Sequence, residues 1–296
     1  MNKTRSLVNS LLVCGVTLVL GSNLGAQTTN RTAKVVRVEG TARYSINNGA
    51  DWSFLTVGTV LKEGTLLQTG TRENSYIDLV LGEGRSVTMA TPGAGGGKNG
   101  SGGSAHQHPS NVDVVRLYKD TVLGLDKLSA NPTGAGVQTE TQLDLRKGHI
   151  TGNVKKMVAG SNYEIRYPKG VAGIRGSVYD MSLVEGINNG TVTVTLVLDM
   201  LTGSAVVSFY PSGSTTPITQ TVLPGFGFDT GTDALTPLSP AQVSELSQIL
   251  ASMGVTTTVA VTVVAGNNTT IEQVTTTTGQ QAPSTAGQQT GGSTVQ

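Results

Sequence analysis

The first stretch with clear periodicity alternates between apolar and polar side chains, as β-strands do. In Thr41–Ile46, the side chains of Ala42, Tyr44 and Ile46 share one face, and Ser75–Leu81 alternates in the same way. A period of two places one set of side chains in a core and the other in solvent. Glycine- and asparagine-rich turns separate these runs. The pattern predicts a series of short strands between residues 34 and 90.

Residues 162 to 210 carry the strongest strand signal. Valine and leucine alternate with threonine over most of Val192–Leu198. We expect a turn at Asp199–Leu201, after which Thr202–Tyr210 pairs back on the preceding strand. Further strands are expected as far as residue 237.

One helix is predicted at residues 239–253. Ser239 is a suitable N-cap, Pro240 suits the first helical position, and Gln242 completes a capping box. Gly254 supplies the stop. One face of this helix is apolar: Val243, Leu246, Leu250 and Met253.

Three segments do not have the composition of a core. Residues 91–111 form a glycine-rich stretch that predicts a surface loop, and a second loop is expected at Ser129–Gly136. Residues 267–296 consist mainly of threonine, glutamine, glycine and serine, which predicts a disordered tail. Val255–Ala265 is expected to form one more strand before it.

The amino-terminal residues have the pattern of a secretory signal peptide. Lys3 and Arg5 precede the apolar run Leu7–Leu20, and small residues lead to a cleavage site between Ala26 and Gln27. The signal peptide is therefore predicted at residues 1–26, with export to the periplasm or outer cell surface. The alternative is an uncleaved anchor, but a spanning helix needs about 20 apolar residues. No stable membrane span is expected in the mature chain.

Composition and charge narrow the class of protein. The only cysteine, Cys14, lies inside the predicted signal, so the mature chain has no disulfide. Aromatic and charged residues are scarce, while glycine, threonine and valine are abundant, as in strands joined by tight turns. Between residues 27 and 176 there are eighteen bases and twelve acids; the seven acids that follow have no base among them. Bases interleaved with acids do not make the basic patch that nucleic acid requires.

Two ordered series of residues resemble the FecR domain. The first series comprises Val38–Gly40, Trp52, Val57–Gly58, Leu61–Gly64, Leu67–Gly70 (with Thr69) and Ser75–Leu81. The second is Tyr163–Asp180, which contains Gly170, Gly173, Arg175 and Gly176 and has Ser177 where the family most often has threonine. The resemblance covers residues 34–185 and implies a β-rich extracytoplasmic module. It also implies a stand-alone form without the sigma-regulating amino-terminal region, so the ferric citrate role does not transfer.

The repeated glycines suggest what the first series does physically. Gly58, Gly64 and Gly70 are six residues apart, at positions where successive turns need a positive φ. Trp52 is the only tryptophan, and we expect it to be buried as a core anchor. Arg175 is expected to pair with a buried carboxylate such as Asp180 or Asp144. The predicted fold is all-β, a roll, short solenoid or sandwich with one carboxy-terminal helix and a disordered tail.

The sequence offers little catalytic chemistry. His106 and His108 could bind a divalent ion only weakly, because no acid lies near them in sequence. The glycine-rich stretch around Lys98 lacks the Gly-Lys-Ser/Thr of a phosphate-binding loop. No serine lies in a Gly-x-Ser-x-Gly elbow. We therefore expect no enzyme activity, no cofactor and no metal site.

Two functions remain open from sequence. The first is a non-catalytic binding or sensing module in the bacterial envelope, linked through the resemblance to signalling or iron-uptake regulation. The alternative is a structural envelope component that binds polysaccharide or other surface proteins. The sequence identifies neither the envelope protein nor the polysaccharide that would be the partner.

Overall fold

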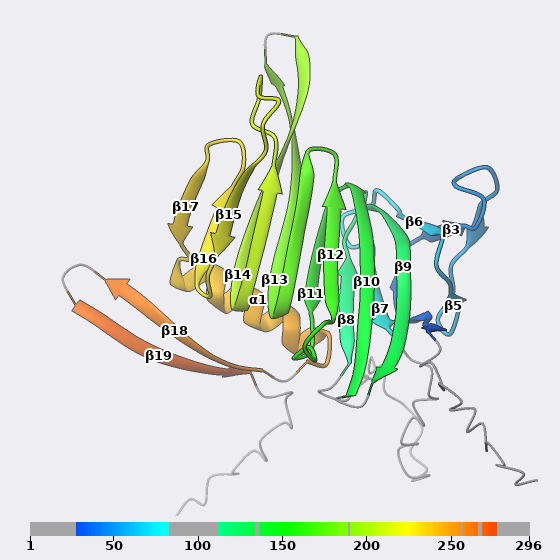
Figure 1. Ribbon diagram of the computed structural model, residues 1–296, viewed down its shortest axis with the longest axis horizontal. Helices are drawn as coiled ribbons and strands as arrows, with labels where there is room; N and C mark the ends of the chain where they lie inside the picture. Colours follow the sequence, from blue (N-terminus) through cyan, green and yellow to red (C-terminus); the bar gives the residue numbers. More distant parts are fainter. Residues whose placement is uncertain are drawn as a thin grey trace, which may run out of the picture.

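The computed structural model describes residues 28–82, 112–133, 136–188, 190–255, 257–265 and 268–276. The protein is mostly β, with 60% strand and one helix near the carboxyl end. Its strands form a curled sheet with the shape of a half-barrel (Figure 1). The prediction of an all-β module with one helix is confirmed.

The bounds of the elements follow the chain order. The first strands are β1 (Thr29–Asn30), β2 (Ala33–Glu39), β3 (Ala42–Ser45), β4 (Ser53–Phe54), β5 (Val60–Leu61), β6 (Thr65–Thr69), β7 (Tyr76–Leu81) and β8 (Asp113–Leu117). The next are β9 (Val122–Thr133), β10 (Gly136–Lys147), β11 (His149–Asn153), β12 (Asn162–Tyr167), β13 (Gly170–Asn188) and β14 (Thr191–Phe209). The last are β15 (Ile218–Val222), β16 (Phe226–Asp229), β17 (Ala234–Pro237), α1 (Pro240–Ser252), β18 (Thr257–Ala265) and β19 (Asn268–Thr276).

The strand pairings divide the sheet into two layers that share β13 and β14. The recess layer runs through β4, β3, β6, β9, β10, β12, the first half of β13, the second half of β14, and β15. The helix layer runs through β5, β2, β7, β8, β11, the second half of β13, the first half of β14, β16, and β17. Only the pairing of β10 with β12 is parallel among these.

A sharp corner in β13 and β14 carries the chain from one layer to the other. The pairing slips between Arg175 and Val178, where Gly176 has a φ of 54°. Opposite it, Gly203 has a φ of 70°, and a Cβ there would lie 2.2 Å from the Ser177 hydroxyl oxygen. That hydroxyl donates to the carbonyl of Arg175 at 2.7 Å and accepts from a backbone N–H of β14. Bulges of this kind bend a strand without ending it.

The predicted hairpin turn at Asp199–Leu201 is wrong. These residues and Thr202–Tyr210 lie almost entirely within the single strand β14, which pairs with β13 along its whole length. No glycine or asparagine stands at 199–201 to allow a tight hairpin. The first glycine, Gly203, makes the corner instead.

The main core lies between the two layers and includes four large aromatic side chains. They are Tyr163, Tyr179, Phe209 and Phe228, each at most 2% exposed. A second, smaller core lies on the outer side of the helix layer, beneath α1. The predicted cap at Ser239 is present with its capping box, and all four apolar residues expected on the helix face are buried there.

Two strand patterns differ from the prediction. Ile46 is 71% exposed, whereas Ser45 is buried because its hydroxyl accepts the N–H groups of Asn47 and Gly49 in the following turn. The strand β7 is buried on both faces: Leu79 packs in the main core and Val80 beneath the helix. A strand covered on both sides does not show clean alternation.

The remaining predictions concern the loops and the tail. The chain stays in strand through Thr133, so the loop predicted at Ser129–Gly136 is mostly part of the β9–β10 hairpin. The strand predicted near Val255–Ala265 is present as β18. It pairs with β19, so residues 268–276 of the predicted tail form a strand. The signal peptide, the glycine-rich loop 91–111 and residues 277–296 lie outside the described residues.

Candidate functional site

A row of polar side chains crosses the helix layer at right angles to its strands. Its members stand directly opposite one another on successive strands: Arg37, Asp78, Arg116, Thr151, Asp180 and Asp199. We call this the helix-side row. It lies on the face that α1 covers, because the neighbouring Val80, Val114 and Val178 pack against that helix.

The basic end of the helix-side row is buried and closely paired. The Arg116 guanidinium donates to both carboxylate oxygens of Asp78, at 2.7 and 2.8 Å, and the two residues are 5% and 1% exposed. Arg116 also donates to the Ser252 hydroxyl at 2.7 Å, and Arg37 donates to the Ser252 carbonyl at 2.9 Å. The two arginines thus place positive charge at the carboxyl end of α1, where the helix dipole is negative. The helix itself has no basic residue in its last turn.

The acidic side chains at the other end of the row, Asp180 and Asp199, also accept hydrogen bonds from neighbouring side chains. The His149 Nε2 atom lies 2.7 and 2.8 Å from the two carboxylate oxygens of Asp180, and the Tyr118 ring stacks on His149 at 4.1 Å. Burial, and then the negative charge of Asp180, raise the pKa of Asp199 to about 6. The Gln242 amide, at the start of α1, donates to Asp199 at 3.3 Å. The row therefore holds both ends of the helix and leaves few groups for a ligand.

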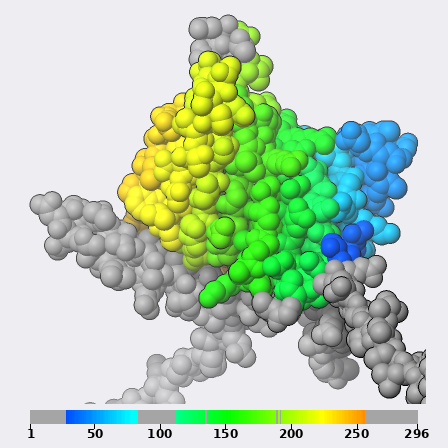
Figure 2. Space-filling view, in the orientation of Figure 1, coloured from blue at the N-terminus to red at the C-terminus, as the bar shows by residue number. Residues whose placement is uncertain are grey.

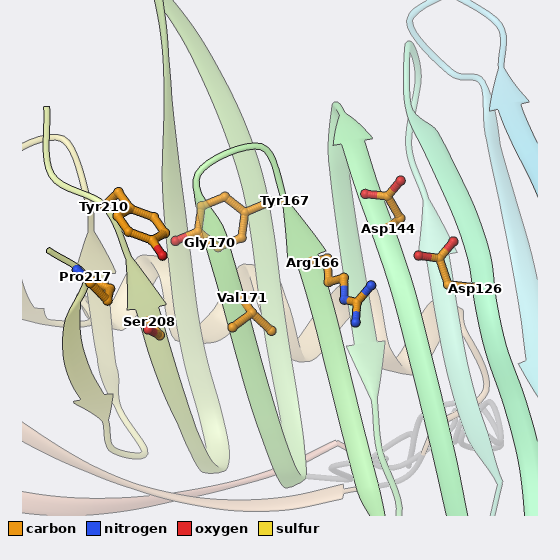
Figure 3. Close-up of a pocket in the computed structure, with 9 residues that line it drawn as sticks. All are labelled: Asp126, Asp144, Arg166, Tyr167, Gly170, Val171, Ser208, Tyr210 and Pro217. Atoms are coloured by element: carbon orange, nitrogen blue, oxygen red, sulfur yellow. The ribbon is translucent and has the colours of Figure 1, made fainter. Parts of the chain in front are cut away.

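The opposite face of the protein is open. Figure 2, in the orientation of Figure 1, shows the outer surface of the recess layer, with no helix in front of it. A recess of about 500 Å³ crosses this face (Figure 3). Its lining residues come from β9, β10, β12, β13, β14 and the segment that follows: Asp126, Asp144, Arg166, Tyr167, Gly170, Val171, Ser208, Tyr210 and Pro217.

The charged end of the recess contains two acids and one base. A Cβ at Gly124 would lie 3.1 Å from Asp126 Oδ1 and 3.2 Å from Asp144 Cβ, so the two acids are neighbours. Burial, and then the charge of Asp144, raise the pKa of Asp126. Asp144 accepts a hydrogen bond from Arg146 at 2.7 Å. Arg166 stands opposite Asp144 on β12 but makes no side-chain hydrogen bond or ion pair with any described residue.

The other end of the recess is aromatic. Tyr167 is 6% exposed, and its hydroxyl has no hydrogen-bond partner among the described residues. Tyr210 is 48% exposed. A Cβ at Gly170 would lie 2.7 Å from the Tyr167 hydroxyl and 2.1 Å from the Ser208 carbonyl oxygen, so only glycine fits there. Figure 3 shows the Tyr167 hydroxyl near Gly170, on the side of its ring that faces Tyr210.

The structure places the other motif glycines at turns and close contacts. The expected positive φ is present at Gly58 and Gly64, at 92° and 84°. Gly70 does not have it; a Cβ there would instead lie 2.3 Å from the Thr41 hydroxyl oxygen, so a close contact requires the glycine. Three other motif residues have local roles: Gly40 makes a turn with a φ of 72°, Thr69 is buried and accepts the Thr121 N–H, and Gly173 pairs with Val206 in the hairpin of β13 and β14.

Two side-chain predictions are wrong. Trp52 is half-buried rather than a core anchor, and the Arg43 guanidinium lies 4.4 Å from the centre of its ring. Arg175 is exposed, and the carboxylates expected to pair with it bind Arg146 and His149. The corner of β13 turns Arg175 outward on the recess layer, whereas Asp180 lies beyond the corner on the helix layer.

Sequence reasoning missed most of the recess. Of its lining residues, Asp144 was named only as a possible partner of Arg175, and Arg166, Tyr167, Gly170 and Val171 only as members of the FecR-like series. Asp126 and Tyr210 are far apart in the chain, and their meeting depends on the pairing order of five strands. The one local signal was the Tyr-Pro-Lys-Gly turn, which carries Tyr167 and Gly170.

Searches of the described residues for two other kinds of site found none. No cluster of His, Cys, Asp and Glu in these ranges could hold a metal ion. Among the described helices, none has the length and apolar character needed to cross a membrane.

Comparisons with known proteins give only a distant likeness. No family model and no curated protein matches the chain. Two crystal structures described as a "putative anti-sigma factor" from Parabacteroides distasonis match it with TM-scores of 0.29 and 0.30 and 12% identity. The matches cover 46% of this chain and 55% and 56% of the matched chains, so the likeness spans about half the length of each. Similarity at this level carries no argument about function.

Proposed function

We propose that this chain is an exported, non-catalytic binding or sensing module of the bacterial envelope, and that the recess layer carries its binding face. One observation carries the proposal: α1 covers the polar row on one face, whereas the opposite face carries an open recess lined by two carboxylates, an arginine and a partly exposed tyrosine. The exposed Arg166 guanidinium lines the recess and makes no side-chain hydrogen bond or ion pair with a described residue. Exposed charged and aromatic groups gathered in one recess are available to a ligand.

The amino-acid sequence supports the rest of the proposal. The basic and apolar leader that ends at Ala26 supports export. The residues that resemble the FecR domain support a regulatory role rather than catalysis. This role is a proposal about the class of protein and does not name the signal.

The test is a deletion of the gene followed by measurement of all transcripts. A sensing module predicts a defined set of changed transcripts, which the wild-type chain restores. Arg166→Ala is expected not to restore them. Arg175→Ala is the matched control, because Arg175 is an exposed arginine on the same layer that does not line the recess. If the deletion changes no transcripts, sensing is rejected.

Export is tested separately by amino-terminal sequencing of the protein from the envelope fraction. A sequence that begins at Gln27 is the expected result. An intact Met1 on membrane-bound protein would contradict it.

The alternative function is a structural envelope component that binds polysaccharide. The open recess favours it, because carboxylates and an exposed tyrosine on a shallow surface suit a long polar ligand. A deletion strain that becomes sensitive to detergent, without any change in transcripts, would support this alternative over sensing.

A further inference from the structure

The strands beneath the recess cannot accept another strand. β10, β12, β13 and β14 each have a paired neighbour on both sides in this layer. A peptide that binds by adding a strand needs an unpaired edge. A peptide therefore cannot bind here by extending the sheet.

The charges around the recess balance. Asp126 and Asp144 are matched by Arg166 and by Arg146, which bonds to Asp144. A site for a polyanion needs an excess of bases, and this one has none. Carboxylates that accept hydrogen bonds beside a guanidinium that donates them suit a neutral ligand with many hydroxyl groups.

The aromatic end adds a flat apolar surface. The ring of Tyr210 is about half exposed, and Pro217 also lines this end of the recess. A tyrosine ring that is partly exposed to solvent offers an apolar face to C–H groups and a hydroxyl for hydrogen bonds. Tyr167 lies at the same end but packs in the main core with its hydroxyl buried.

The length of the recess favours a chain over a single small molecule. Its lining extends across five neighbouring strands, from β9 to β14. Adjacent strands are about 4.8 Å apart, so four spacings span roughly 19 Å. A linear ligand lying across the strands would reach both the carboxylates and Tyr210.

We infer that the recess binds a neutral carbohydrate chain, with Asp126, Asp144 and Arg166 bonding sugar hydroxyls and Tyr210 packing against a sugar ring. This inference rests on the proposed function of the recess layer as a binding face. It goes beyond that function by naming the chemical class of the ligand.

Affinity electrophoresis of the full protein tests the inference. Native gels contain hydroxyethylcellulose, laminarin, dextran or mannan as neutral probes, and alginate as the anionic probe. The wild-type protein is expected to be retarded by at least one neutral polysaccharide in a manner insensitive to salt. No retardation by any neutral probe, or retardation by alginate alone that salt abolishes, overturns the inference.

Matched variants locate the binding surface. Tyr210→Ala and Arg166→Ala are each expected to weaken binding about fivefold or more, the equivalent of one lost hydrogen bond or packing contact. Phe54→Ala removes an aromatic ring that is 81% exposed and outside the recess, and Arg175→Ala removes an outside arginine. Both controls should bind like the wild type. Equal losses in controls and recess variants would contradict the inference.

The outcomes also distinguish this inference from the proposed function. A strain whose transcripts respond to deletion, but whose protein binds no neutral glycan, rejects the inference and keeps the sensing module. Specific binding to a glycan without any transcript response keeps the inference and rejects sensing.

Discussion

The helix layer and the recess layer each carry polar side chains across their strands, but only one of these arrangements is enclosed. Beneath α1, Arg116 and Asp78 are almost completely buried and bind each other through two hydrogen bonds. On the recess layer, Arg166 stands opposite Asp144, is exposed and makes no side-chain hydrogen bond or ion pair with a described residue. Charges that the fold buries must be paired, whereas an exposed charge retains its water at little cost. The contrast therefore separates the groups that hold the protein together from those left for a ligand.

The largest expected effect comes from breaking the buried pair. Asp78→Ala leaves Arg116 buried without its carboxylate and should lower the free energy of unfolding by about 3–5 kcal/mol. Asp144→Ala, on the open face, should cost less than about 1 kcal/mol, because its pair with Arg146 is partly exposed. Urea unfolding of both variants measures the difference. Equal losses would mean that the two faces do not differ as described.

The corner that joins the layers is the next most sensitive place. Gly203→Ala combines a positive φ with close contacts to Ser177 and two carbonyl oxygens, so a loss of about 3 kcal/mol is expected. Gly225→Ala is the control, since Gly225 has a φ of 78° but no atom within 4 Å of an added Cβ. It should cost only about 1 kcal/mol. Thermal unfolding of the two variants separates backbone strain from crowding; equal shifts would argue against a crowded corner.

A smaller loss is expected at the tryptophan. Trp52 is half-buried and stacks with Arg43, so Trp52→Ala should cost about 1 kcal/mol. Phe228→Ala removes a ring that is 1% exposed in the main core and should cost about 3–5 kcal/mol. Guanidinium unfolding compares them. If the tryptophan variant lost as much as the phenylalanine variant, Trp52 would be a core residue after all.

The smallest effect depends on pH. Because the pKa of Asp199 is raised to about 6 from 3.8, the folded protein holds this proton more tightly than the unfolded chain. Stability from this group is therefore present at low pH and is lost as the pH rises from about 4 to about 6. Asp199→Asn should raise stability by about 1 kcal/mol at pH 7, after allowance for partial exposure, and by almost nothing at pH 4. Glu245→Gln, an exposed change on α1, is the control.

Unfolding curves at pH 4 and pH 7 test whether the buried charge of Asp199 causes the gain in stability. A gain that is the same at both values would show that removal of the charge at Asp199 is not its cause. A loss at pH 7 would indicate that the hydrogen bond from Gln242 outweighs the burial of the charge.

Sequence reasoning predicted the parts of the fold that depend on neighbouring residues. The helix, with its Ser239 cap and buried face, follows from residues within one or two turns of each other. The turns at Gly58 and Gly64 are also local. These predictions succeeded because the capping bonds and the backbone angles are set within a few residues.

The polar arrangements on the two faces could not be predicted in the same way. Arg37, Asp78 and Arg116 meet because three strands align in register, and that register depends on the packing of the whole core. The corner at Gly176 and Gly203 was missed because each glycine looks like an ordinary turn when read alone. Arg175 was expected to pair with Asp180 or Asp144, but the bend places Asp180 on the other layer and Asp144 pairs with Arg146.

The hairpin of β13 and β14, which both layers share, is synthesised after most of the strands that it closes into the core. The strands from β2 to β11 leave the ribosome before β12, β13 and β14 exist. One edge of β10 and one edge of β11 are then unpaired, because their later partners β12 and β13 are missing. Unpaired edges of this kind attract strands from other chains. A product truncated before residue 209 would keep open edges and lack the hairpin that closes the core. Incomplete chains are therefore expected to aggregate, and the hairpin of β13 and β14 decides whether the strands made before it become part of a stable protein.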